Sequence, residues 1–124
     1  GTVTSMFIRT HADGTPGDNL KCAIHADASG TIGTLLGVTS ASATNNGNDE
    51  WFQVACSITI PAPGDYWLVA VANNFNPKVA KEAAGPPQMI MANGTYSYAS
   101  PPSSWPGTDA TYDGQLSIYA VLEY

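Results

Sequence analysis

The sequence predicts an all-β protein, an antiparallel β-sandwich with about seven or eight strands. Short runs of β-branched, aromatic and aliphatic residues recur along the 124 residues and are separated by clusters of Gly, Pro, Asn and Asp. Within several runs apolar and polar residues alternate, which places successive strand side chains on opposite faces of a sheet. The length fits a single domain with one core, spanning residues 1–124.

Eight runs meet the criteria for a strand, each bounded by turn residues. In sequence order they are Thr2–Thr10, Leu20–Ala26, Leu35–Ser42, Trp51–Ile60, Tyr66–Asn73, Gln88–Met91, Thr95–Ala99 and Gln115–Tyr124. In three of the runs the alternation is regular enough to predict which residues face the core. These are Leu20, Cys22, Ile24 and Ala26, then Phe52, Val54, Cys56 and Ile58, then Leu116, Ile118, Ala120 and Leu122. The intervening residues, His25 among them, are expected on the outer faces.

The two cysteines, Cys22 and Cys56, both fall on the core face of their predicted strands. Their separation lacks the short spacing of a metal knuckle or a redox dithiol. If the two strands are neighbours or face each other, a disulfide would close a loop of about 35 residues and contribute a few kcal/mol. The alternative is two buried thiols, because free cysteine is among the most buried residue types. The sequence leaves both open.

The composition excludes several classes of partner. Charged residues make up 11 % of the chain, the formal net charge is −6, and the four basic residues are scattered singly. Such a chain offers no basic surface to nucleic acid or to anionic membranes, and its longest apolar run, Tyr66–Ala72, is too short to span a bilayer. A surface rich in Ser, Thr, Asn and Gly is common outside cells. We therefore expect a secreted protein, and Gly1 in place of an initiator Met indicates a processed or excised chain.

No motif for catalysis is present in the sequence. It lacks the Gly-x-Ser-x-Gly elbow, His-Glu-x-x-His, Cys-x-x-Cys and glycine loops for phosphate. Five of the seven aspartates stand beside Gly or Asn, where Asp commonly caps a turn, although a hydrolase would need only two converging carboxylates. We expect no enzyme, no catalytic residues and no required cofactor.

Oxygen-rich loops could hold a structural calcium ion through carboxylates and backbone carbonyls. Residues 13–19, 45–50 and 108–113 are the three candidate segments. None matches the twelve-residue calcium loop between two helices, so ordinary turns are the favoured alternative. A calcium ion here would stabilise loops and take no part in chemistry.

The aromatic residues give the clearest indication of function. Three Trp and six Tyr occur in a chain with few charges. Exposed indole and phenol rings match the flat apolar C–H faces of sugar rings, while nearby amides and carboxylates can bind the hydroxyls. This chemistry suits a neutral glycan better than a phosphate.

Trp105 is the strongest single candidate for a ligand contact. It lies in residues 101–107, a loop with three prolines and few apolar groups that could bury the indole locally. The alternative is a plug that closes one end of the sandwich. Trp51 alternates with Gln53 and Ser57 on a polar face, which favours exposure. The full set of candidate ligand-binding residues is Trp105, Trp51, Tyr112, Tyr119, Tyr98, Gln53 and Asn74.

Four segments resemble, in their order, the jelly-roll domains of secreted bacterial proteins, including carbohydrate-binding modules attached to glycanases. They are residues 21–27 (Lys-Cys-Ala-Ile-His-Ala-Asp), 51–53 (Trp-Phe-Gln), 63–70 (Pro-Gly-Asp-Tyr-Trp-Leu-Val-Ala) and 116–120 (Leu-Ser-Ile-Tyr-Ala). The resemblance implies a jelly-roll sandwich, an aromatic-lined glycan site and a structural calcium. In such modules the Gly-x-Tyr-Trp-Leu signature, here at residues 64–68, belongs to the scaffold, so it says nothing about the ligand.

The leading hypothesis is a non-catalytic carbohydrate-binding module for a neutral β-glucan, of the cellulose or mixed-linkage type. It would hold a linked glycoside hydrolase near its polysaccharide substrate. The scarcity of basic residues argues against sulfated or uronic-acid polymers. The alternative is a structural or adhesive β-sandwich of a cell surface or virion, in which the aromatic residues make protein contacts.

Overall fold

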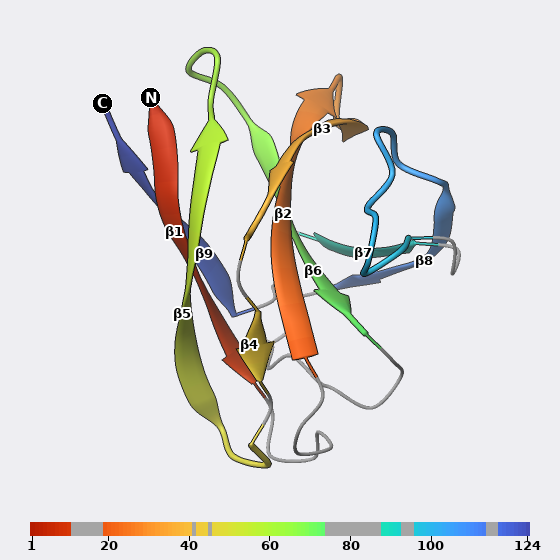
Figure 1. Cartoon of the computed structure of the whole chain (residues 1–124). Helices are drawn as coiled ribbons and strands as arrows, with labels where there is room; N and C mark the ends of the chain where they lie inside the picture. Colours follow the sequence, from red (N-terminus) through yellow and green to blue (C-terminus); the bar gives the residue numbers. More distant parts are fainter. Residues whose placement is uncertain (11–18, 41, 45, 74–87, 93–95, 114–116) are drawn as a thin grey trace.

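The computed structural model is all-β, and its two main antiparallel sheets pack as a β-sandwich (Figure 1), which confirms the predicted fold class. It describes residues 1–10, 19–40, 42–44, 46–73, 88–92, 96–113 and 117–124. Among these residues no helix is long and apolar enough to cross a membrane. The jelly-roll connectivity stays a prediction.

The first sheet, sheet A, has three strands with β1 (Thr2–Thr10) in the middle. β5 (Glu50–Thr59) and β9 (Ile118–Glu123) pair with β1 on its two sides, both antiparallel. Both pairings are irregular between Val3 and Ser5, as at a β-bulge: the pairing with β5 has an extra residue in β5, and the pairing with β9 has an extra residue in β1. The first strand of the chain thus lies beside the last.

The second sheet, sheet B, is built around β2 (Asn19–Ala28). β6 (Tyr66–Ala72) pairs with β2 over most of its length. On the other side β3 (Thr31–Val38) pairs with the later half of β2, and the short β4 (Ala43–Thr44) pairs with its beginning. The predicted strand over residues 35–42 therefore begins earlier, at Thr31, and ends earlier, at Val38, while β4 follows just beyond the predicted range.

A two-residue turn joins β2 to β3. Ser29 and Gly30 both have positive φ, at 56° and 86°, as the hairpin turn that matches strand twist requires. The Asp27 carboxylate accepts a hydrogen bond from the Gly30 backbone N–H at 3.1 Å, and from the Trp67 indole N–H at 2.9 Å. Asp27 therefore acts as a structural acid that stabilises the turn and orients Trp67.

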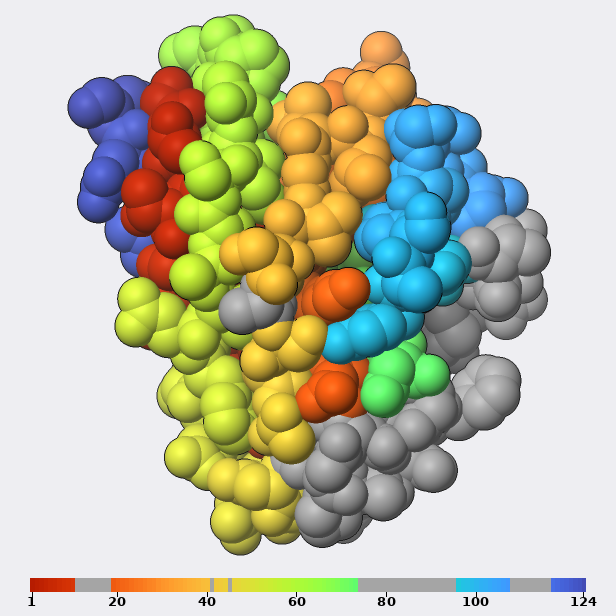
Figure 2. All heavy atoms as spheres, in the orientation of Figure 1, coloured from red at the N-terminus to blue at the C-terminus, as the bar shows by residue number. Residues whose placement is uncertain are grey.

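β7 (Gln88–Ala92) and β8 (Thr108–Asp113) form a separate antiparallel pair. The prediction of a strand over residues 95–99 was wrong, because the described residues 96–107 follow an irregular path across sheet B (Figures 1 and 2). The prediction of a loop over residues 108–113 was also wrong, since these residues are β8. Alternation of tyrosines in residues 96–98 resembled a strand but reflects contacts of the side chains with sheet B.

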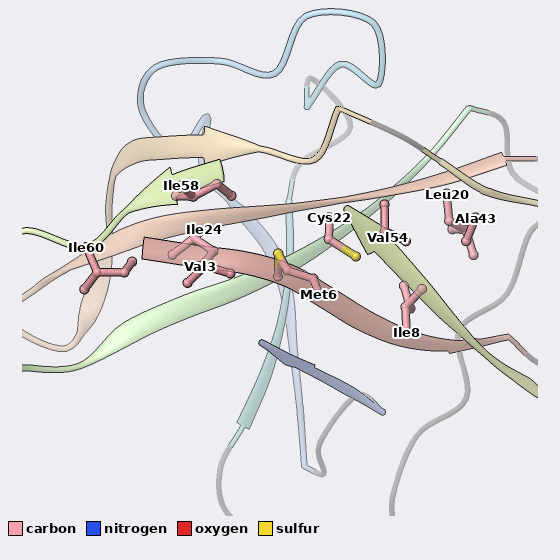
Figure 3. Packing of buried hydrophobic residues seen from close by; sticks show 10 residues of the cluster. All are labelled: Val3, Met6, Ile8, Leu20, Cys22, Ile24, Ala43, Val54, Ile58 and Ile60. Atoms are coloured by element: carbon pink, nitrogen blue, oxygen red, sulfur yellow. The ribbon is translucent and has the colours of Figure 1, made fainter. Parts of the chain in front are cut away.

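The core lies between the sheets and confirms the predicted faces of the described parts of β2, β5 and β9 except at Ala26, which is half-buried and does not belong to the cluster. Figure 3 shows ten of its buried residues: Val3, Met6, Ile8, Leu20, Cys22, Ile24, Ala43, Val54, Ile58 and Ile60. Phe52, Cys56, Ile118, Ala120 and Leu122 pack against this cluster, while Leu116 lies outside the described residues. Ala23 and His25 are fully buried as well, on the outer face of sheet B, where the sequence predicted exposure.

Candidate functional site

Aromatic side chains gather on the outer face of sheet A. Met6 and Ile8 of β1 point into the core, so the alternation turns Phe7 and Arg9 outward. The strand register then places Phe7 between Gln53 of β5 and Tyr119 of β9. It also pairs Arg9 with Trp51. We call the five residues Phe7, Arg9, Trp51, Gln53 and Tyr119 the sheet A aromatic face.

The three aromatic rings of this face form one continuous cluster across the three strands. The rings of Phe7 and Tyr119 are stacked, with centroids 4.6 Å apart and planes 7° apart. The Trp51 ring lies 5.3 Å from Tyr119 and is tilted by 58°. The Arg9 guanidinium carbon is 6.0 Å from the Trp51 ring centroid, at the outer limit of a cation–π contact. Each aromatic contact contributes about 0.5–1.5 kcal/mol beyond burial, so the cluster is preorganised.

The cluster is open to solvent. Trp51 is 45 % exposed and Tyr119 is 46 % exposed, and Val121 on the same side of β9 is 38 % exposed. Gln53 is exposed beside them. Scattered single apolar residues on a surface need no explanation, but a contiguous exposed patch marks an interaction site. The sheet A aromatic face is therefore the candidate functional site.

The predicted site residues are only partly brought together. Trp51, Tyr119 and Gln53 meet on this face, as their polar alternation indicated. Phe7 and Arg9 were missed, although their alternation with Met6 and Ile8 places them on the same side. The sequence contains no strand order, and pairing of β1 with both β5 and β9 is what unites these residues.

Trp105 lies on the opposite side of the sandwich. Residues 96–107 cross the outer face of sheet B (Figure 2), and the Ser103 carbonyl accepts a hydrogen bond from the Leu35 N–H at 2.9 Å. The Trp105 ring meets His25 edge-on with centroids 5.9 Å apart, and lies 5.6 Å from Tyr96. The indole is half-buried and covers sheet B, so Trp105 does not extend the sheet A aromatic face.

The remaining predicted site residues do not join the face either. Lys21 Nζ lies 4.4 Å from the centroid of the Tyr98 ring and donates to the Tyr98 carbonyl at 3.3 Å. The Tyr98 hydroxyl is 2.6 Å from Ser42 Oγ, so this tyrosine is held against sheet B. Tyr112 belongs to β8, of which only the backbone is described, and Asn74 lies outside the described residues.

His25 is the buried polar centre of the sheet B side. Its Nδ1 is 2.8 Å from the Gly33 carbonyl oxygen, and its Nε2 is 2.9 Å from the Tyr96 hydroxyl. A carbonyl only accepts, so Nδ1 donates to Gly33; in a neutral ring Nε2 then accepts from Tyr96. These hydrogen bonds hold the side chain in a position that is buried from solvent. His25 therefore has a structural role.

We expect Tyr96 to make the protein sensitive to alkali. Burial raises the pKa of Tyr96 to about 12, whereas an unfolded phenol ionises near pH 10. Between these values the unfolded state has already lost the proton that the folded state retains, so the free energy of unfolding falls as pH rises from about 10 to about 12.

Urea unfolding of the wild type and of Tyr96→Phe from pH 8 to 12 measures this effect. The variant should lose less stability than the wild type across the upper part of the range. If the free energy of unfolding of the two proteins depended on pH in the same way, Tyr96 would have the same pKa in the folded and unfolded states.

Cys22 and Cys56 are free thiols in the structure. Cys22 is buried in the core, and this burial, together with the nearby Cys56, raises its pKa to about 12. Cys56 is half-buried, and its Sγ donates to the Val3 carbonyl at 3.5 Å. Burial also raises the pKa of the Cys56 thiol.

The candidate calcium segments gain no support from the described residues. No group of three His, Cys, Asp or Glu side chains there is arranged to hold a metal ion. Residues 46–50 form a hydrogen-bonded turn, in which Asn46 Oδ1 accepts from the Asn48 N–H at 3.2 Å and its amide donates to the Glu50 carboxylate. Residues 13–18 lie outside the described residues, so a structural calcium ion stays a prediction.

Comparison with models of protein families, with curated protein sequences and with solved structures gives no match for this chain. Function is therefore inferred from the chemistry of the sheet A aromatic face. That face offers two exposed aromatic rings and an exposed amide side by side on sheet A.

Proposed function

We propose that the chain is a non-catalytic module that binds a neutral glycan on the sheet A aromatic face. The observation that carries this proposal is the contact between the exposed rings of Trp51 and Tyr119. Sugar rings present apolar C–H faces that stack on indole and phenol, and the Gln53 amide can exchange hydrogen bonds with their hydroxyls. The sheet holds these groups in place before the ligand arrives, which lowers the entropic cost of binding.

The charge of the chain supports a neutral ligand. The formal net charge is −6, so a sulfated or uronic-acid polymer would be repelled at long range. On the face itself the positive group is Arg9, whose guanidinium lies over the Trp51 ring and whose Nε is buried without a hydrogen-bond partner among the described residues. A buried Nε is poorly placed to bind an anionic polymer.

The tilt between the Trp51 and Tyr119 rings favours a single glycan chain as the ligand rather than a flat crystalline surface. Rings that are 58° apart cannot both lie against one plane. The Tyr119 ring also has one of its faces against Phe7, so only part of it is free for a ligand. Among β-glucans we therefore propose soluble mixed-linkage or amorphous chains. The resemblance noted in the sequence adds a secreted location and a linked glycoside hydrolase to this proposal.

Affinity electrophoresis in gels that contain mixed-linkage β-glucan, hydroxyethylcellulose, xylan or galactomannan tests the proposal. The wild type should be retarded by a glucan, and Trp51→Ala should weaken binding by about tenfold or more, the effect typical of a buried aromatic anchor. Tyr119→Ala should act in the same direction.

Trp105→Ala is the matched control, because it removes the same side chain type from the other side of the sandwich. It should keep the retardation, provided that near-UV circular dichroism shows a folded protein. Absence of retardation by every polysaccharide would sink the proposal. If Trp51→Ala were still retarded and Trp105→Ala were not, the binding site would lie on sheet B.

A structural or adhesive role is the second candidate, and the exposure of Val121 favours it. This apolar side chain extends the aromatic face along β9 without offering a sugar any hydrogen bond. If the face packs on a second copy of the chain, sedimentation at rising concentration should reveal self-association. Val121→Ser should then reduce that association.

A further inference from the structure

Cys22 and Cys56 come from different sheets and point into the same core. Cys22 follows Leu20 on the inward side of β2, and Cys56 follows Val54 on the inward side of β5. Figure 3 shows the Cys22 side chain directed into the cluster of buried residues, and Cys56 packs against that cluster. Both thiols therefore lie in the space between sheet A and sheet B.

The core-facing residues that follow the two cysteines, Ile24 in β2 and Ile58 in β5, show how these strands are aligned across the sandwich. Ile58 of β5 lies against Gly37, where an added Cβ would be 2.8 Å from the Ile58 Cγ1. Gly37 is the pairing partner of Ile24 in β2, so Ile24 and Ile58 stand at the same level. β2 and β5 run in the same direction (Figure 1). Two residues earlier in each strand, Cys22 and Cys56 therefore also lie opposite each other across the sandwich.

The adjacent residues Thr39 and Ser40 connect the backbone at Cys22 with the backbone next to Cys56. The Thr39 N–H donates to the Cys22 carbonyl at 2.8 Å, and Thr39 Oγ1 accepts from the Cys22 N–H at 3.1 Å. The next residue, Ser40, donates to the carbonyl of Ala55 at 3.3 Å, directly before Cys56. The backbones at both cysteines are thus held by one dipeptide. The effect of Cys56 on the pKa of Cys22 agrees with a short separation.

From this alignment we propose that Cys22 and Cys56 form a modification site, where oxidation joins sheet A to sheet B through a disulfide. A low-molecular-weight disulfide serves as the oxidant. The Cys56 thiolate attacks one sulfur of the oxidant, forms a mixed disulfide and releases one thiol. The Cys22 thiolate then attacks Cys56 Sγ and displaces the second thiol. The two cysteines lose two electrons and two protons in total, and the oxidant is reduced to two thiols.

The order of the two steps follows from burial. Cys56 is the more exposed thiol and reacts first, whereas Cys22 is deep in the core and its raised pKa keeps it protonated. Ring closure is therefore the slow step and proceeds through local opening of the sandwich. Once formed, the disulfide closes a loop of about 35 residues and should raise the thermal unfolding midpoint by roughly 10 °C.

The experiment uses the whole chain, first reduced and then incubated with oxidised glutathione at pH 8.5. The protein is denatured, alkylated with iodoacetamide and weighed by intact-mass spectrometry. The expected product is a monomer that has lost two hydrogen atoms and carries no alkyl group. Its unfolding midpoint should exceed that of the reduced wild type by the shift given above.

Cys56→Ala is the control variant, since this half-buried position tolerates a smaller side chain. Its Cys22 should stay alkylatable after the same treatment, and its midpoint should not respond to the oxidant. Two alkylated thiols in the treated wild type would overturn the proposal. So would a persistent glutathione adduct on Cys56, a disulfide-linked dimer, or an internal disulfide that leaves the midpoint unchanged or lower.

Discussion

Replacing Met6 with alanine is expected to lower the free energy of unfolding by about 3 kcal/mol. Met6 is 0 % exposed and lies on β1, the central strand of sheet A, where it pairs with Val54 and Ala120. Its side chain points into the centre of the cluster in Figure 3. Truncation removes apolar contacts and leaves a cavity that β1, hydrogen-bonded on both sides, cannot close by moving. Domains of this kind have a total stability of about 5–15 kcal/mol, so the loss is large.

Guanidinium chloride unfolding monitored by tryptophan fluorescence measures this loss. Met6→Leu keeps the volume and should cost less than about 1.5 kcal/mol. Val121→Ala, on the exposed face of the neighbouring strand, should change the stability by about 0.5 kcal/mol or less. If Met6→Ala were no more destabilising than Val121→Ala, Met6 would not be packed as the structure has it.

Replacing His25 with phenylalanine should cost about 2–4 kcal/mol of stability, although the new side chain is more apolar. His25 is 0 % exposed and is hydrogen-bonded through both ring nitrogens. Phenylalanine would fill the space but leave the Gly33 carbonyl and the Tyr96 hydroxyl without their partner. It would also disturb the edge-on contact with Trp105, and so loosen residues 96–107 from sheet B.

A double-mutant cycle isolates the bond between His25 and Tyr96. Tyr96→Phe should cost about 1–2 kcal/mol, and the double variant should cost less than the sum of the two single variants by about 1 kcal/mol. Denaturant unfolding supplies all the values. Strict additivity would mean that His25 and Tyr96 stabilise the fold independently, and that the hydrogen bond between them contributes nothing.

Much of the fold could be predicted from local pattern. Alternation in β2, β5 and β9 placed Leu20, Val54 and Ile118 on the inner faces, because successive strand side chains must point to opposite sides. The tight Ser29–Gly30 turn was not predicted, because the next strand was expected only from Leu35 and β3 begins at Thr31. The strand over residues 108–113 was missed, since its Asp and Gly neighbours are typical of a loop.

The candidate site could be predicted only in part. Trp51 and Gln53 alternate with core residues, so their exposure followed from β5 alone. That Tyr119 meets them, and that Phe7 lies beneath Tyr119, depends on β1 pairing with both the fifth strand and the last. Non-local pairing of this kind leaves no trace in the local pattern of any one strand.

The sequence by itself determined the all-β class and most of the inward faces of β2, β5 and β9, because these depend on neighbouring residues. Tertiary structure alone decided which outer face is covered. His25 has the alternation of an exposed residue, yet it is buried by Tyr96, which is 71 residues away along the chain. The same covering segment draws Trp105 against sheet B and leaves Trp51 and Tyr119 in solvent on sheet A. Burial of an outer face depends on the path of a distant segment, and local periodicity cannot encode that path.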